Sequence, residues 1–239
     1  IRYGRAGKIE VMRSLQILSE FLSKYYNKSV ILLIDEYDVP MARATSNGYY
    51  KEMLEIMKGF MQALKDNQCI KLAVITGCLK IAKESIFTGT NNFVSNTITS
   101  SRLNEYYGFV QNEVDRILED AEIKGKGDIM KKWYDGYHFG DVDVYCPWDV
   151  MCYVDDLQKN PNAKPDEYRK DTSDNATIRS FIDYAGASIT KKLETLMNGG
   201  YIIQRVDENL IYDYLHSSEE NLWNLMYLTG YLTQVRDYK

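Results

Sequence analysis

The segment ILLIDEYDVP (31–40) places acids directly after an apolar run. Asp35 and Glu36 follow four aliphatic residues, and Asp38 comes two positions later. Parallel sheets place ligand chemistry at the carboxyl ends of their strands, where successive side chains point to opposite sides. The first acid could hold Mg²⁺ through water while the second orients or deprotonates an attacking water. Acids that merely terminate a strand give the same pattern, and we interpret Asp38 as a residue that closes the turn.

Thr76 directly follows a second apolar run, IKLAVI (70–75). Its hydroxyl could lie beside the γ-phosphate of a nucleotide, or Thr76 and Gly77 could begin an ordinary turn. The residues alone leave both alternatives open.

A nucleotide site of this kind also needs a phosphate loop, G-x-x-x-x-G-K-[ST], between a strand and a helix. The Gly7-Lys8 pair does not provide one, because Arg2 occupies the first glycine position and Ile9 follows the lysine. We therefore expect the acids to lie in a pocket that is incomplete within these 239 residues.

The elements around the acids are predicted from periodicity. Apolar residues at helical spacing predict helices over 9–26 and 50–64, and 39–48 is expected to be a loop or short turn. The unbroken run SVILLI (29–34) indicates a strand buried on both faces. With the strand at 70–75 it forms a βαβ unit, whose crossover should be right-handed.

The rest of the chain is predicted to be mostly helical. GYHFGDVDVYCPW (136–148) fits a hairpin or an extended loop, KNPNAKPDE (159–167) is a linker candidate, and 201–205 with 210–215 fit a hairpin. Helices are expected over 111–122, 127–135, 147–158, 175–185, 188–197 and 217–232, the last capped by Ser217 or Ser218. The C-terminal pattern is compatible with a winged-helix-like module.

Composition excludes several classes of function. The net charge is −5 and the pI is about 5.2. The chain therefore has no overall excess of basic residues, which nucleic-acid-binding proteins usually show. Four cysteines without a CxxC pair and two distant histidines give no support to a zinc site or a Cys–His nucleophile. No apolar run reaches the roughly 20 residues of a membrane span, and no signal peptide is visible. We expect a cytoplasmic protein with reduced thiols and no membrane association.

Several segments together resemble one family. ILLIDEYDVP, ITGCLKIAKESIFTGTNNF, WYDGYHFG, VYCPWDV and LTGYLTQ follow one another in the order of the bacterial AAA-ATPase-like proteins. These are P-loop proteins related to archaeal and STAND ATPases, often with a C-terminal domain resembling PD-(D/E)XK nucleases. The resemblance implies a P-loop ATPase core followed by a helical region. Together with the elements predicted above, this gives an α/β fold: a partial P-loop NTPase parallel sheet over 1–110, a helical and hairpin region over 111–166, and a winged-helix-like or helical module over 167–239.

The resemblance also implies roles for four residues. Asp35 matches the magnesium acid, Glu36 the water-activating acid and Thr76 the polar sensor after the next strand. Lys80 occupies a position where we expect arginine in relatives. Lysine keeps the positive charge but lacks the planar guanidinium group that forms paired hydrogen bonds with phosphate. ATP and Mg²⁺ are the cofactors implied for the complete protein, and an effector protein or the nuclease-like domain is an implied partner.

This chain resembles the middle of such a protein, with the phosphate loop before residue 1 and the nuclease-like domain after residue 239. We expect strands 29–34 and 70–75 either to pair directly or to flank an empty slot, with exposed edges that favour a missing segment or a homo-oligomer. The alternative function is a non-catalytic module that binds protein or DNA. Nuclease chemistry within this chain is not supported, since no D…ExK arrangement is present.

Overall fold

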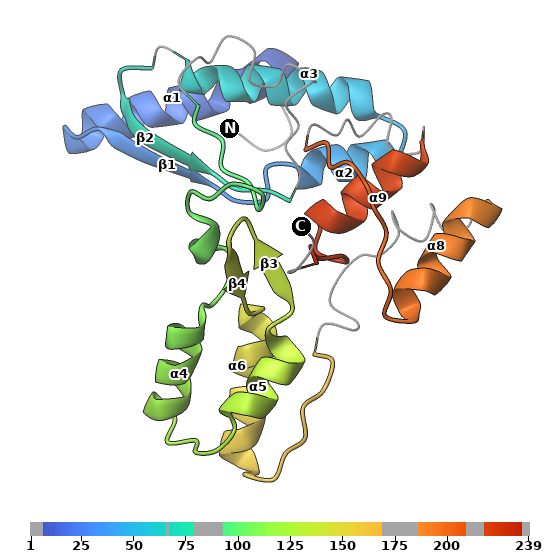
Figure 1. Ribbon diagram of the computed structural model, residues 1–239. Coiled ribbons are helices and arrows are strands. Elements are labelled where there is room, and N and C mark those ends of the chain that lie inside the picture. The colour runs from blue at the N-terminus through green and yellow to red at the C-terminus, as the bar shows by residue number, and fades with distance from the viewer. Residues whose placement is uncertain (1–6, 66, 79–92, 169–185, 209–217, 236–239) are drawn as a thin grey trace. The chain divides into compact units, whose positions relative to one another are not determined.

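The computed structural model describes residues 7–65, 67–78, 93–168, 186–208 and 218–235 (Figure 1). Contacts divide the chain into two compact units, and each is described by itself. Unit 1 comprises residues 1–93 with 204–229, and unit 2 comprises 94–203 with 230–239. The division into 1–110, 111–166 and 167–239 stays a prediction.

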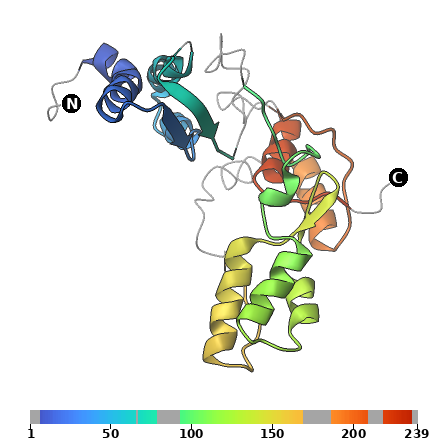
Figure 2. The same ribbon diagram turned by 90° about the vertical axis from the view of Figure 1, so that its left-hand side faces the viewer.

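Unit 1 contains a strand–helix–strand arrangement preceded by a helix. In chain order it holds α1 (Lys8–Tyr26), β1 (Val30–Ile34), α2 (Val39–Ser46), α3 (Tyr50–Met61) and β2 (Ile70–Ile75). β1 and β2 pair directly and in parallel, and α1 packs beside α3 along one face of this pair (Figures 1 and 2). Direct pairing is thus the alternative that the structure adopts. Assignment of the pair to a P-loop sheet stays a prediction.

The expectation of a strand buried on both faces is wrong. Side chains alternate along β1, and Ile31 and Leu33 are 59% and 72% exposed. Leu72 and Val74 of β2 are 53% and 46% exposed. The apolar side chains on one face of the pair are therefore exposed. The two helices α1 and α3 lie on the opposite face (Figure 2).

The prediction of a loop over 39–48 is also wrong. The Asp38 carbonyl accepts hydrogen bonds from the N–H groups of Met41 and Ala42, each at 3.0 Å, and this starts α2. Pro40 suits the first turn, since its missing N–H would have no helical partner there. Met41 is fully buried, so packing of one face stabilises a helix whose sequence contains turn-forming residues.

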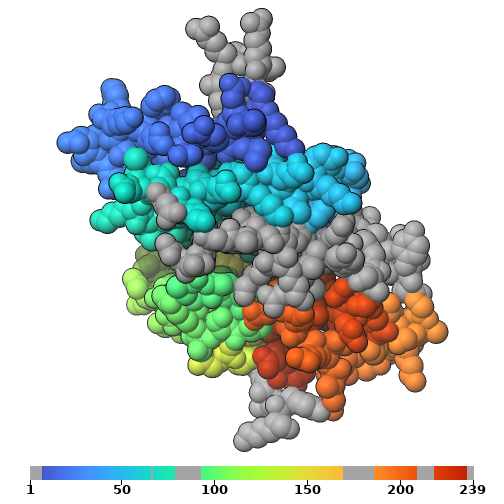
Figure 3. Space-filling view, turned by 90° about the horizontal axis from the view of Figure 1, so that it is seen from above, coloured from blue at the N-terminus to red at the C-terminus, as the bar shows by residue number. Residues whose placement is uncertain are grey.

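α1 ends where Asn27 adopts a left-handed conformation, with φ of 49°. Its inner side buries Leu15 and Ser19, and Figure 3 shows part of the helix on the molecular surface. The C-terminal contribution to unit 1 is α9 (Glu219–Leu228), which the sequence predicted over 217–232. Ser218 caps it by accepting a 3.2 Å hydrogen bond from the N–H of Asn221.

Unit 2 is built around three helices and a hairpin. α4 (Gln111–Asp120), α5 (Gly127–Tyr134) and α6 (Pro147–Lys159) surround the core, and β3 (Tyr137–Phe139) pairs with β4 (Val142–Val144) in antiparallel register. The hairpin alternative for 136–148 is therefore the one observed. The core comprises Val114, Leu118, Met130, Tyr134, Tyr145, Val150, Tyr153, Val154 and Leu157. α8 (Ala187–Met197) is also assigned to this unit by contacts.

Asn104 and Gly140 fix the hairpin turn. Asn104 Nδ2 donates to the Phe139 carbonyl at 2.8 Å and to Asp141 Oδ1 at 2.7 Å. Gly140 has φ of 60°, and a Cβ there would lie 2.7 Å from the Ser100 carbonyl oxygen. Only glycine combines this backbone conformation with so close an approach.

Part of the C-terminal prediction lies outside the described residues. This applies to the helix over 175–185 and to 210–215 of the predicted hairpin, whereas 201–207 form no strand. The winged-helix-like module stays a prediction. Within the described ranges, no helix combines the length and apolar character needed to cross a bilayer.

Candidate functional site

The parallel pair brings the candidate residues to one edge. Asp35 and Glu36 follow β1 directly, and Thr76 follows β2 directly. Ile34 and Ile75, the last residues of the two strands, are register partners. The carboxyl ends of β1 and β2 therefore coincide, as expected for a ligand-binding edge of a parallel sheet.

Backbone hydrogen bonds continue the ladder past the strand ends. The N–H of Thr76 donates to the Ile34 carbonyl at 2.9 Å, and the N–H of Tyr37 donates to the Thr76 carbonyl at 3.0 Å. The Thr76 hydroxyl donates to Asp35 Oδ1. Thr76 therefore holds the candidate magnesium acid, rather than only starting a turn.

Glu36 lies in a strained position. Its φ is 52°, a left-handed conformation that is unfavourable for a residue with a Cβ. Its N–H donates to Asp35 Oδ1 at 3.0 Å, and its side chain is exposed. Such outliers persist only where the surroundings fix them, and they are enriched at functional sites. The turn separates the two acids, so Asp35 faces Thr76 while Glu36 projects to solvent.

Asp38 has a structural role that the sequence did not reveal. It is 3% exposed, and its Oδ1 accepts a 3.2 Å hydrogen bond from the N–H of Cys78. A Cβ on Gly77 would lie 2.5 Å from this same oxygen and 2.6 Å from the Tyr37 ring. Asp38 thus ties the segment after β2 to the segment after β1. The only sequence signal was a third acid near a glycine-containing turn, which is common in ordinary loops.

Lys80, the remaining predicted site residue, lies outside the described residues. Across the ranges that are described, no group of three or more His, Cys, Asp or Glu residues could hold a metal ion.

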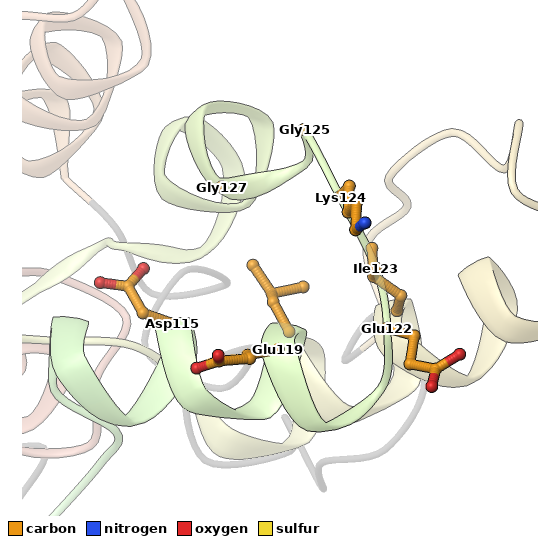
Figure 4. A pocket seen from close by; sticks show the side chains of 8 residues that line it. Asp115, Glu119, Glu122, Ile123, Lys124, Gly125 and Gly127 are labelled. Carbon is orange, nitrogen blue, oxygen red and sulfur yellow. The ribbon is translucent and has the colours of Figure 1, made fainter.

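A separate hollow of about 330 Å³ lies in unit 2, between α4 and the start of α5. Figure 4 shows Asp115, Glu119 and Glu122 on its acidic side and Lys124 on the connecting loop. The carboxylates are spread along the helix and its end instead of converging on one point. This hollow is therefore not a cation site.

Comparison with known proteins found one matching family. Residues 3–87 match the family described as predicted AAA-ATPase. This part of the chain is therefore similar to AAA-ATPase-like proteins. The match includes Asp35, Glu36, Thr76 and Lys80, and it ends before unit 2 begins.

A protein of Azotobacter chroococcum mcd 1, named "Uncharacterized protein in vnfD 5'region", is 29% identical over 125 residues. The matched segment covers 51% of this chain and 24% of that protein, so the match spans about a quarter of the relative's length. No solved structure matches the chain.

Proposed function

We propose that unit 1 contributes the acidic half of a Mg-ATP hydrolysis site. The observation that carries the proposal is the hydrogen bond from Thr76 to Asp35 across the common edge of β1 and β2. Asp35 would hold Mg²⁺ through water, and Glu36 would orient or deprotonate the attacking water. Thr76 would link the metal ligand to the neighbouring strand, where a γ-phosphate sensor acts, and Lys80 would add positive charge near the phosphates.

The site needs a phosphate loop that these 239 residues do not contain. We propose that a segment N-terminal to residue 1 supplies it, and that nucleotide binding then acts on the helical region and an effector, such as a nuclease-like domain. We expect the 239-residue chain alone to bind Mg-ATP weakly or not at all, because it lacks the loop whose backbone N–H groups bind the phosphates.

Calorimetry tests this proposal on two proteins: the 239-residue chain and a version extended N-terminally through its native coding sequence. Binding of Mg-ATP only by the extended version is the expected result. Absence of binding by both would remove the proposal.

Variants of the extended protein then separate the roles of the acids. Glu36→Gln should keep Mg-ATP binding and lower the hydrolysis rate by about 10²–10⁴-fold, as for loss of a general base. Asp35→Asn should instead raise the Mg²⁺ concentration needed for activity. Glu52→Gln, at an exposed acid in the first turn of α3, is the matched control and should leave both unchanged. Normal hydrolysis by the Asp35 and Glu36 variants would contradict the roles assigned to these acids.

The second candidate, a non-catalytic interaction module, is favoured by the exposed apolar face of β1 and β2. Exposed apolar patches mark interaction surfaces in soluble proteins. Under this proposal the acids merely end a strand, and the face binds another polypeptide, with a homo-oligomer as the simplest case. Sedimentation of the chain with and without Leu33→Lys would test it, since the charge should abolish association. The acidic net charge argues against strong DNA binding.

A further inference from the structure

Unit 2 contains a second hollow, of about 250 Å³, at the junction of α5, β3 and α6. Its walls include the aromatic rings of Trp133, Tyr134, Tyr137 and Tyr231, and Asp149 is its one acidic lining residue. Residues 230–233 close one side. This segment is held to the hairpin by a 3.0 Å hydrogen bond from the His138 N–H to Thr233 Oγ1.

Asp149 carries a carboxylate oxygen without a partner. Its Oδ1 is shielded from solvent and accepts no hydrogen bond from any described residue. Asp149 lies in the first turn of α6, where acids usually face the free N–H groups of the helix. Buried acceptors in native proteins nearly always have a partner. The Asp149 carboxylate therefore keeps hydrogen-bonding capacity that no described residue uses.

The adjacent phenol does not supply that donor. The Tyr134 hydroxyl donates to the Asp166 carbonyl at 3.2 Å and accepts from the Asp166 N–H at 3.1 Å. Asp149 is close enough that its negative charge helps to raise the pKa of Tyr134, after the larger effect of burial. The hollow is therefore lined by one carboxylate and four aromatic residues.

We propose that this hollow binds a guanidinium group. A planar guanidinium stacks on aromatic faces, is weakly hydrated, and donates paired hydrogen bonds to one carboxylate. The volume is below the roughly 300–1,000 Å³ of pockets for drug-sized ligands, so the hollow accommodates a head group but not a nucleotide. A hard metal ion does not fit, because Ca²⁺ and Mg²⁺ require several oxygen ligands and Asp149 is the single carboxylate. The proposal is independent of ATP hydrolysis by unit 1.

Trp133 provides the readout, because it lines the hollow and is about half exposed. The ¹⁵N-labelled 239-residue chain is titrated with methylguanidinium chloride, at constant ionic strength set with NaCl. The indole N–H resonance of Trp133, assigned from a Trp133→Phe variant, is followed by NMR. A saturable shift of this resonance is expected, with the resonance of the buried Trp223 unchanged. Parallel titrations use the capped peptides Gly-Arg-Gly and Gly-Lys-Gly.

Asp149→Asn should weaken methylguanidinium binding by about tenfold, since it removes one charge-assisted pair. Asp128→Asn is the matched control, because Asp128 is an exposed acid in the first turn of α5 outside this hollow, and it should bind like the parent. If Asp149→Asn does not fold, Trp133→Leu with calorimetry as readout should also weaken binding several-fold by removing an aromatic wall.

Equal binding of methylguanidinium and the arginine peptide supports a site for the head group alone. Binding of the peptide only supports an arginine side chain from a protein segment, and binding of methylguanidinium only supports a small-molecule ligand. The lysine peptide should bind more weakly than the arginine peptide. Absence of a saturable shift with both guanidinium probes at tens of millimolar, or equal affinity of Asp149→Asn and the parent, would overturn the proposal.

Discussion

Gly77 is the position where one added methyl group should do most damage to the candidate site. In Gly77→Ala the new Cβ would lie 2.5 Å from Asp38 Oδ1 and 2.6–2.7 Å from two carbons of the Tyr37 ring. Asp38 and Tyr37 are both buried, so neither can move into solvent without loss of packing. The clash therefore has to be relieved by separating the two segments that follow β1 and β2.

The expected cost follows from two contributions. Overpacking a tight site costs about 1–3 kcal/mol, and loss of the hydrogen bond from the Cys78 N–H to Asp38 adds about 1 kcal/mol. We expect Gly77→Ala to lower the free energy of opening of the β1–β2 region by about 2–4 kcal/mol. Gly127→Ala is the control, because a Cβ there meets nothing within 4 Å.

Hydrogen exchange measured by mass spectrometry is the appropriate assay, since it reports opening free energies segment by segment. Peptides covering β1 and β2 should exchange faster in Gly77→Ala, whereas peptides from α4 and α6 should not change. Protection of β1 and β2 within about 0.5 kcal/mol of the parent would refute the close packing around Asp38.

Three further predictions concern single side chains. Burial raises the pKa of Tyr134 to about 12, so the stability that its protonated phenol contributes is complete below pH 10 and is lost as the pH rises toward 12. Urea unfolding at pH 9 and pH 11 should show the parent losing about 1.4 kcal/mol more than Tyr134→Phe; equal losses would contradict this. Tyr50→Phe should be neutral or stabilising by up to about 1 kcal/mol in urea unfolding, because the buried Tyr50 hydroxyl has no hydrogen-bond partner among the described residues. Ser218→Ala should destabilise α9 by about 1 kcal/mol, because the N–H of Asn221 loses its cap, and unchanged hydrogen exchange in α9 would count against this cap.

The sequence located two helices, both strands and the acids of unit 1 well, but it missed α2. Hydrophobic periodicity placed α1, α3, β1 and β2 within a few residues, because each buries a regular set of side chains. The position of Asp35 and Thr76 at one edge followed from parallel pairing alone. Periodicity gave no information on the free face of the sheet, since an apolar run looks the same whether another element covers it or not.

The contacts that define the site were less predictable. Glu36 adopts a left-handed conformation that no local propensity indicates. Asp38 bonds Cys78, forty residues away in sequence, and only the folded sheet brings the two together. Likewise, the aromatic hollow of unit 2 combines WYDGYHFG and VYCPWDV with Gly230–Thr233, a juxtaposition that spacing along the chain does not encode.

The discontinuity of unit 1 has a consequence for biosynthesis. Residues 1–93 leave the ribosome before the α9 segment that belongs with them, which follows only after residue 203. At roughly 5–20 residues per second, translation of the intervening segment takes about 5–20 s. Throughout that interval the nascent chain carries the open edges and apolar face of β1 and β2. Such a chain should depend on chaperones that bind nascent polypeptides, and slower codons between 94 and 203 should lower its soluble yield.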